Sequence, residues 1–121
     1  MNVLVIDDDK LTLSSLKHSI EGFGHEVTLA ENAEEAMNLI VEGKFDLVFS
    51  DIMMPGISGL SLLNILRNVH LNNTPIIAMS TLNNRALLEA AFQAGTNDFM
   101  IKPFTLVDLE DKLKKFDHSE V

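Results

Sequence analysis

Short apolar runs alternate along the chain with longer stretches in which apolar residues recur every three or four positions. The first run, residues 3–6, reads Val-Leu-Val-Ile and stops abruptly at Asp7. A continuous apolar run of this length is typical of a strand covered on both faces, as the strands of parallel sheets are. The stretch that follows has the spacing of one buried helix face; its members are Leu13, Leu16, Ile20 and Phe23.

The same pairing of a strand with a helix occurs five times. We expect strands at residues 3–6, 26–30, 46–50, 75–79 and 98–101. We expect helices with apolar faces within residues 13–23, 36–41, 60–69, 83–94 and 106–116. Asn32 and the pair Thr105 and Asp108 are residue types that begin helices by accepting first-turn N–H groups. The pattern predicts an α/β fold of (βα)5 type, a doubly wound parallel sheet with right-handed crossovers.

Length and composition predict one ordinary globular domain. The 121 residues are 46% hydrophobic and 22% charged, and a chain of this size buries enough surface to fold without disulfides. There is no cysteine, which excludes thiolate metal sites and fits a reducing compartment. We see no signal-peptide pattern and no apolar stretch near the length of a membrane span, so we expect a cytoplasmic protein without membrane contact. Residues 117–121 are expected to form a frayed tail.

The charge balance argues against one class of partner. The chain has 18 acidic and 9 basic residues, a formal net charge of −9. Binding to a phosphate backbone requires clustered lysine and arginine. We therefore expect no direct contact between this chain and nucleic acid.

Residues that can carry chemistry follow the predicted strands. In chain order they are Asp7, Asp8 and Asp9 after the first strand, Asp51 after the third, Ser80 and Thr81 after the fourth, and Lys102 after the fifth. Ligands of open α/β sheets bind at the carboxyl ends of the strands, so we expect these side chains to share a crevice. Carboxylates without histidine or cysteine favour Mg²⁺ or a similar ion such as Mn²⁺. A metal, an ammonium group and a hydroxyl suit phosphoryl transfer, and a carboxylate is a competent phosphoryl acceptor.

These motifs resemble the receiver domain of two-component response regulators. The segments that carry the resemblance are Val5-Ile6-Asp7-Asp8-Asp9, Ser50-Asp51-Ile52-Met53-Met54-Pro55-Gly56, Ser80-Thr81 and Lys102-Pro103-Phe104. The resemblance extends over about residues 3–116 and implies one receiver domain over residues 1–121. It also implies a flavodoxin-like fold with the strand order 2-1-3-4-5.

The resemblance implies a metal site and a phosphoryl site. Asp51 would accept the phosphoryl group, and Asp8 and Asp51 would ligate Mg²⁺ directly. Asp7 would act on the metal through water, and the backbone carbonyl of Met53 would complete the protein ligands. Lys102 would contact the phosphoryl group.

The resemblance also implies a switch. The Ser80 hydroxyl would move to a phosphoryl oxygen, and Phe99 would follow it inward. The Lys102–Pro103 bond would be cis. Met53 and Leu82 occupy positions that tune phosphoryl loss, and because neither side chain can orient a water molecule, we expect slow self-hydrolysis.

The expected partners are proteins. The resemblance implies a sensor histidine kinase or a histidine phosphotransfer protein as phosphoryl donor. A downstream target, or a second copy of the chain, would bind the surface formed by the fourth helix, fifth strand and fifth helix. From position alone we expect this surface to include Leu87, Ala91, Ala94 and Phe99.

Other interpretations remain open at this stage. Asp7 to Asp9 are acceptable as a helix cap alone, Asp51 as a turn residue, and Phe99 as ordinary core. A degenerate receiver would bind partners without phosphate. The Asp7-x-Asp9 pair superficially matches a haloacid dehalogenase-like phosphohydrolase, although the chain has no room for a cap domain. We expect no conventional enzyme, but a domain that promotes its own phosphorylation and dephosphorylation.

Overall fold

The computed structural model of the chain describes residues 1–53, 59–70 and 73–118. Over these residues five strands form one parallel sheet in the order β2-β1-β3-β4-β5. The strands are β1 (Asn2–Ile6), β2 (Glu26–Ala30), β3 (Leu47–Asp51), β4 (Ile76–Ser80) and β5 (Asp98–Ile101). The helices are α1 (Lys10–Gly22), α2 (Ala33–Glu42), α3 (Gly59–Ile65), the π-helical turn η1 (Leu66–His70), α4 (Arg85–Ala94) and α5 (Leu106–Phe116). The predicted doubly wound, flavodoxin-like fold is confirmed.

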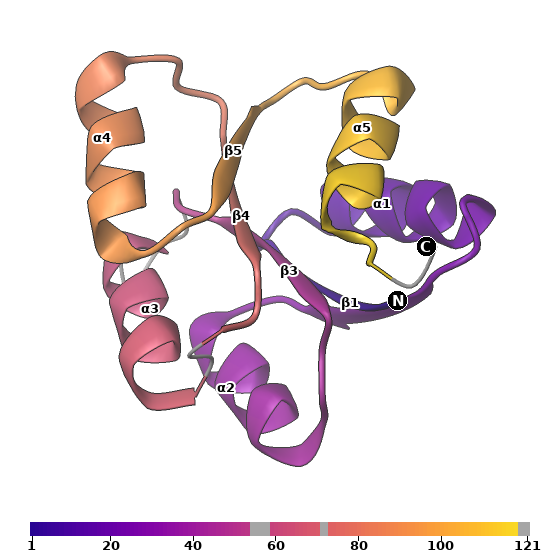
Figure 1. Cartoon of the computed structure of the whole chain (residues 1–121), viewed down its shortest axis with the longest axis horizontal. Helices are drawn as coiled ribbons and strands as arrows, with labels where there is room; N and C mark the ends of the chain where they lie inside the picture. Colours follow the sequence, from indigo (N-terminus) through magenta and orange to yellow (C-terminus); the bar gives the residue numbers. More distant parts are fainter. Residues whose placement is uncertain (54–58, 71–72, 119–121) are drawn as a thin grey trace.

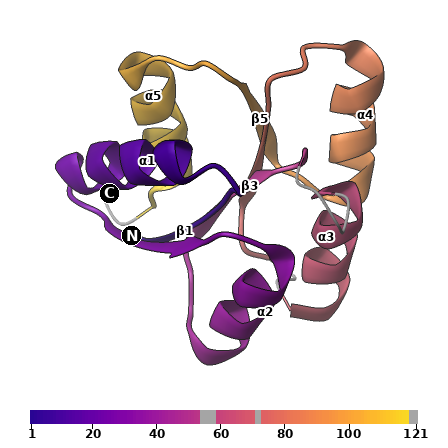
Figure 2. The ribbon, with the colours of Figure 1, turned by 180° about the vertical axis from the view of Figure 1, so that it is seen from behind.

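Helices cover both faces of the sheet, as Figures 1 and 2 show from opposite sides. The helices α1 and α5 lie on one face, and α2, α3 and α4 lie on the other. Successive strand residues point to opposite faces. In β1, Val3 and Val5 therefore enter the core beneath α1 and α5, while Leu4 and Ile6 enter the core beneath α2 to α4. All four are fully buried, which explains why this strand reads as an uninterrupted apolar run.

Two strands end one residue later than predicted. The strand β3 includes Asp51, which pairs with Met79 of β4, and β4 includes Ser80, which pairs with Ile101 of β5. The ladder continues because the next N–H, that of Ile52, still donates to the Met79 carbonyl at 3.0 Å. Asp51 and Ser80 thus lie at the last positions of two neighbouring strands, where the sheet holds their backbones.

Helix starts follow local side-chain chemistry. Asp9, Asn32, Asn84 and Thr105 each accept a first-turn N–H, and Thr105 forms a full capping box with Asp108. The predicted starts at Asn32 and Thr105 are therefore confirmed, whereas α4 begins two residues later than predicted. In the part of the chain that the structure describes, no helix is long and apolar enough to cross a membrane.

The third helical stretch differs from its prediction. We expected one helix through residues 60–69, but α3 ends at Ile65 and continues as the π-helical turn η1. A π-helical turn has one residue more than an α-helical turn, so it changes the direction of the side chains that follow. Residues 54–56 of the predicted motif and residues 119–121 of the predicted tail lie outside the described residues.

Candidate functional site

Three aspartates converge at the carboxyl ends of β1 and β3. Asp7 directly follows β1 and is fully buried, and Asp51 is the last residue of β3 and is 5% exposed. Asp8 is exposed to solvent. One carboxylate oxygen from each residue lies within 4.8 Å of the other two. The sheet thus brings together the three acidic residues that the sequence placed at two strand ends.

Lys102 reaches the same cluster from β5. Its Nζ atom donates to Asp7 Oδ2 at 2.5 Å and to Asp51 Oδ2 at 3.2 Å. The partners are 95 and 51 residues away along the chain, so only the fold brings them together. The bond from Lys102 to Pro103 is cis.

Backbone N–H groups hold the other oxygens of the two buried carboxylates. Asp7 Oδ1 accepts from the N–H of Asp9 at 3.0 Å, and Asp51 Oδ1 accepts from the N–H of Met53 at 2.9 Å. In each of these two carboxylates, one oxygen therefore accepts a hydrogen bond from a backbone N–H and the other accepts one from Lys102. No sequence signal could reveal these donors, because every residue except proline carries a backbone N–H.

The electrostatic environment raises the pKa of Asp51. Burial is the largest cause, and the nearby charge of Asp7 adds to it, while the Met53 N–H and Lys102 only partly offset them. Burial acts to lower the pKa of Lys102, but the hydrogen bond to Asp7 and the charge of Asp51 outweigh it, so the pKa lies above its ordinary value. The cluster therefore holds a firmly protonated ammonium group among carboxylates that repel one another.

The donor set of this cluster fits Mg²⁺. Three acidic side chains face a single ammonium group, an imbalance that a divalent cation would offset. The donors are hard oxygen atoms, and one or two carboxylates plus water is the arrangement that Mg²⁺ prefers in proteins. The exposed Asp8 keeps one side of the cluster open to water.

Asp9 has a different role from its two neighbours. It is exposed, and its carboxylate accepts from the Leu11 N–H at 3.1 Å and from the Thr12 hydroxyl at 2.8 Å. It is the N-cap of α1. Asp9 is not one of the three aspartates whose carboxylate oxygens lie within 4.8 Å of one another.

The predicted switch residues lie on β4 and β5. Ser80 is fully buried, and its hydroxyl accepts from the Leu82 N–H at 3.0 Å. Phe99 lies beside Ala78 in the ladder and is 9% exposed. Its side chain belongs to the core that α4 covers, so a movement of this ring would change the packing beneath α4.

The expected interaction surface needs a correction. Ala91, Ala94 and Phe99 are buried, because they fill the space between α4 and the sheet. The large apolar side chains that α4 exposes are Leu88 and Phe92. Helical spacing alone could not distinguish the two sides, since alanine is common on both.

Two apolar side chains and a pocket border the site. Met53 is 50% exposed and Leu82 is 45% exposed. A pocket of about 490 Å³ includes Lys102 in its lining, together with residues of α1 and of the segment that leads into α5. Lys102 thus connects this pocket to the acidic cluster, although none of the three clustered aspartates lines the pocket.

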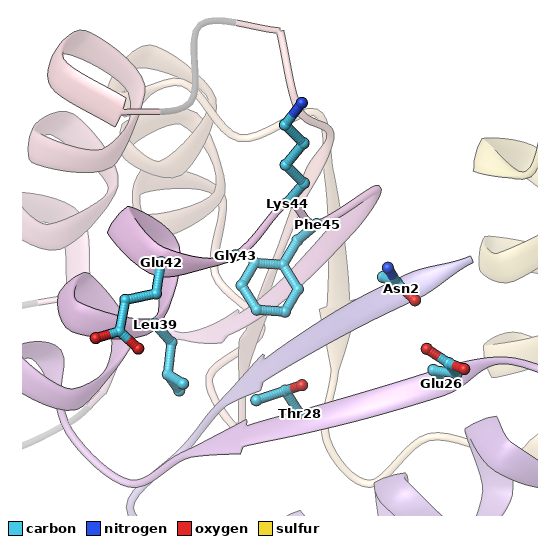
Figure 3. A pocket seen from close by; sticks show the side chains of 8 residues that line it. All are labelled: Asn2, Glu26, Thr28, Leu39, Glu42, Gly43, Lys44 and Phe45. Atoms are coloured by element: carbon cyan, nitrogen blue, oxygen red, sulfur yellow. The ribbon is translucent and has the colours of Figure 1, made fainter.

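A second pocket, of about 310 Å³, lies at the other end of the sheet (Figure 3). It is lined by residues at the starts of β1 and β2 and by the end of α2, with the Phe45 ring among them. None of the predicted site residues lines it. The predicted site residues thus lie away from this pocket.

A family comparison agrees with these observations. The profile of the family described as "Response regulator receiver domain" matches residues 3–114. The "Transcriptional regulatory protein CrdR" of Helicobacter pylori is 34% identical over 114 residues, which cover 94% of this chain and 54% of that protein. The "Transcriptional regulatory protein PrrA" of Mycobacterium bovis is 34% identical over 93% of this chain and 48% of its own length. The chain thus spans about half the length of these curated relatives.

Solved structures share the whole fold. A two-component response regulator from Clostridium difficile superposes with a TM-score of 0.90 at 34% identity, covering 96% of this chain and 94% of the other. The receiver domain of the Francisella response regulator 1452 gives 0.88 at 35% identity, covering 95% and 94%. The chemotaxis protein CheY4 of Vibrio cholerae gives 0.90 at 25% identity, covering 96% and 98%.

Proposed function

The chain belongs to the response regulator receiver domain family, a family of signalling proteins rather than classical enzymes, and on that premise we propose that Asp51 accepts a phosphoryl group from a phosphohistidine donor in a Mg²⁺-dependent reaction. We further propose that the acyl phosphate changes a protein-binding surface. One arrangement carries the proposal: Asp7, Asp8 and Asp51 meet at one edge of the sheet, with Lys102 Nζ between Asp7 and Asp51.

The metal would be held by Asp8 and Asp51, with Asp7 acting through water and the Met53 carbonyl as a further ligand. When bound, Mg²⁺ would neutralise the carboxylates and the oxygens of the incoming phosphoryl group. The protein side of the reaction follows from the contacts of Asp51. The Met53 N–H and Lys102 orient its carboxylate, so that one oxygen can form the new bond to phosphorus. The bond between phosphorus and the donor nitrogen breaks as this bond forms, and its electron pair stays on the nitrogen.

Lys102 would change partners during this reaction. Its ammonium group now bonds both Asp7 and Asp51. Phosphorylation removes the carboxylate charge of Asp51 and adds roughly −1.5 to −2 on the phosphoryl group. The ammonium would then follow the new charge, which stabilises the acyl phosphate.

The same charge would operate the switch. Ser80 ends β4, next to the strand that carries Asp51, and its hydroxyl is a donor of the kind that phosphoryl oxygens attract. Movement of Ser80 would break its bond with the Leu82 N–H and shift the segment that leads into α4. Phe99, packed beneath α4, would adjust its position in the same core. We propose this sequence as the route from Asp51 to the surface of α4, β5 and α5.

The partners follow from the family. Receiver domains interact with histidine kinases, and we propose a sensor kinase or a histidine phosphotransfer protein as the donor, in the cytoplasm. The output would be a downstream protein or a second copy of the chain. Two relatives are named transcriptional regulatory proteins, so our expectation of no contact with nucleic acid is limited to the residues of this chain and stays a proposal.

The test is incubation with acetyl phosphate, with and without Mg²⁺, followed by intact-protein mass measurement. We expect one added phosphoryl group on the wild type, only with Mg²⁺, and none on Asp51→Asn. Asp111→Asn removes an exposed carboxylate of α5 and should be labelled like the wild type. No adduct on the wild type would favour a degenerate receiver, and steady turnover of a small phosphoester would favour a phosphohydrolase; either result contradicts the proposal.

A further inference from the structure

The helix α4 is attached to the domain unevenly. Its two buried residues, Ala91 and Ala94, both lie in its C-terminal half. Residues 82–86, which comprise the segment before the helix and its first two residues, are all exposed, and Leu87 is only half-buried. Buried apolar contacts resist local opening, so the two ends of the helix should differ in mobility.

A single arginine from another element holds the C-terminal end. Arg67, in the turn η1, donates from Nε and Nη2 to the Gly95 carbonyl at 3.1 and 2.9 Å. Its Nη1 donates to the Thr74 carbonyl at 2.8 Å, and Nη2 also donates to Asn97 Oδ1 at 2.7 Å. We call Arg67 with these three acceptors the Arg67 clamp. It joins the end of α3 to the end of α4 and to the segments that enter β4 and β5.

Gly95 is required at the centre of the clamp. It ends α4 with φ of 113°, in the left-handed region that favours glycine. A Cβ atom there would lie 3.0 Å from Arg67 Cγ and 3.2 Å from Arg67 Cβ. The arginine side chain therefore packs directly against the backbone of Gly95. The end of α4 is held by this packing contact as well as by the two hydrogen bonds to the Gly95 carbonyl.

Hydrogen bonds to β4 also hold the residues that follow α4. Asn97 Oδ1 also accepts from the Ile76 N–H at 2.9 Å, and the Asn97 N–H donates to the Ile76 carbonyl at 2.8 Å. Thr96, which is 6% exposed, accepts through Oγ1 from the Ala78 N–H at 3.1 Å. The residues that follow α4 are thus bonded into β4, whereas the residues before it connect to Ser80 through an exposed segment.

We propose that the Arg67 clamp makes the C-terminal end of α4 a fulcrum, so that events at Ser80 tilt the helix by its N-terminal end instead of displacing it as a whole. The inference rests on the proposed function for its trigger, but the clamp itself exists in the unphosphorylated protein. Arg67 is a positioning residue in this scheme, because its acceptors lie at the opposite ends of the strands from the acidic cluster. It would set the direction in which the switch moves its output helix.

The rise of an α-helix gives a test that does not depend on the size of the tilt. Ala86 lies about 13.5 Å from Gly95 along the axis and Gln93 about 3 Å, at roughly 1.5 Å per residue. Any tilt about Gly95 moves Ala86 about 4.5 times as far as Gln93. A translation of the whole helix moves both positions equally.

The absence of cysteine allows spin labels to be placed at chosen positions. Ala86→Cys or Gln93→Cys, both at exposed positions, is combined with Lys17→Cys in α1 or Glu34→Cys in α2, which are also exposed. Distances are measured by pulsed electron resonance with and without Mg²⁺ and beryllium fluoride. We expect a shift at Ala86 about 4.5 times that at Gln93. Equal shifts, a larger shift at Gln93, or no shift at Ala86 in a protein that has bound beryllium fluoride would each overturn the proposal.

A second measurement works without any phosphoryl chemistry, which separates failure of this proposal from failure of the proposed function. Amide hydrogen exchange is followed at Gly95 and Thr96, whose N–H groups bond the last turns of α4, and at Leu88 near its start. Arg67→Met should accelerate exchange at Gly95 and Thr96 about tenfold and leave Leu88 unchanged. Unchanged exchange at Gly95 and Thr96 in Arg67→Met would refute the proposed role of the clamp. If exchange accelerates as expected but no phosphoryl adduct forms on the wild type, the result counts only against the proposed function of Asp51.

Two further variants serve as controls for the exchange measurement on Arg67→Met. Arg85→Met removes an exposed guanidinium from α4 itself, which pairs only with Glu89 at 3.0 Å among the described contacts, and should leave Gly95 and Thr96 unaffected. Arg67→Lys keeps the charge, but a single ammonium cannot serve three separated acceptors. It should accelerate exchange in the same direction as Arg67→Met by a smaller factor, which keeps the test available if the methionine variant folds poorly.

Discussion

Replacing Asp51 by asparagine should make the metal-free protein more stable, although it removes the residue on which the proposed function depends. The amide side chain would keep the shape of the carboxylate and an oxygen that can accept from the Met53 N–H. It would remove a negative charge from a residue that is 5% exposed and close to two other carboxylates. Stability of the metal-free domain thus favours asparagine at position 51, whereas the proposed function requires aspartate.

The separations in the cluster give the magnitude. At an effective dielectric constant of about 20, the attraction between Asp51 and Lys102 at 3.2 Å is about 5 kcal/mol. The oxygens of Asp7 and Asp51 are no more than 4.8 Å apart, which gives a repulsion of at least about 3.5 kcal/mol, and the exposed Asp8 adds a smaller, screened contribution. These pair energies nearly cancel. What remains is the cost of burying the Asp51 charge, several kcal/mol before the Met53 N–H offsets part of it, so we expect the substitution to stabilise by about 2 kcal/mol.

The assay is urea unfolding followed by far-ultraviolet circular dichroism, because the chain has no tryptophan or tyrosine. In chelator at neutral pH, Asp51→Asn should raise the urea midpoint by about 1 M, since m is about 1–3 kcal/mol/M for small domains. Saturating Mg²⁺ should stabilise the wild type, by about 2.7 kcal/mol at a hundred times its dissociation constant, and the variant much less. Asp111→Asn, which changes an exposed carboxylate, should behave like the wild type in both conditions.

The pH dependence has a definite sign. The pKa of Asp51 is raised in the folded protein, so the folded state favours its protonated form. The associated stability is fully present below the unfolded pKa of about 3.9 and is lost as pH rises through the folded value. The advantage of Asp51→Asn should therefore be small at low pH and grow as pH rises. A metal-free variant that is no more stable than the wild type at neutral pH, or one that Mg²⁺ stabilises equally, would refute the electrostatic reasoning.

Three other expectations concern neighbouring positions. Polar replacements Met53→Gln and Leu82→Asn should shorten the lifetime of the acyl phosphate, measured by loss of radiolabel, because they can orient a water molecule; equal or longer lifetimes would contradict this. Ser50→Ala should stabilise by about 1 kcal/mol in urea unfolding, since the buried Ser50 hydroxyl is the side-chain polar atom without a hydrogen-bond partner among the described residues; a clear loss would indicate a missed partner. Thr96→Val should destabilise by about 1–3 kcal/mol by leaving the Ala78 N–H unpaired, whereas Thr96→Ser, which keeps the hydroxyl, should cost much less.

Most of the fold was predictable from the sequence because its signals are local. Apolar runs of strand length and stretches of helical period mark the elements, and Asn32 and Thr105 mark two helix starts. The π-helical turn η1 was missed, since one additional residue in a turn leaves the apolar spacing almost unchanged. The outward side of α4 was also assigned wrongly, because Ala91 and Ala94 are small enough for either face.

The sequence by itself determined which side chains were available for the site and at which strand ends they lie. Parallel strands place their carboxyl ends at one edge, so Asp7, Asp51 and Lys102 could be expected to meet there. Only the tertiary structure decided how they are bonded: Asp7 is buried against Lys102, and backbone N–H groups hold one oxygen of each buried carboxylate. The Arg67 clamp was likewise not predictable from the sequence, since its acceptors are mainly backbone carbonyls. Backbone groups are the same at nearly every residue, and which of them face a given side chain depends on packing between segments far apart in the chain.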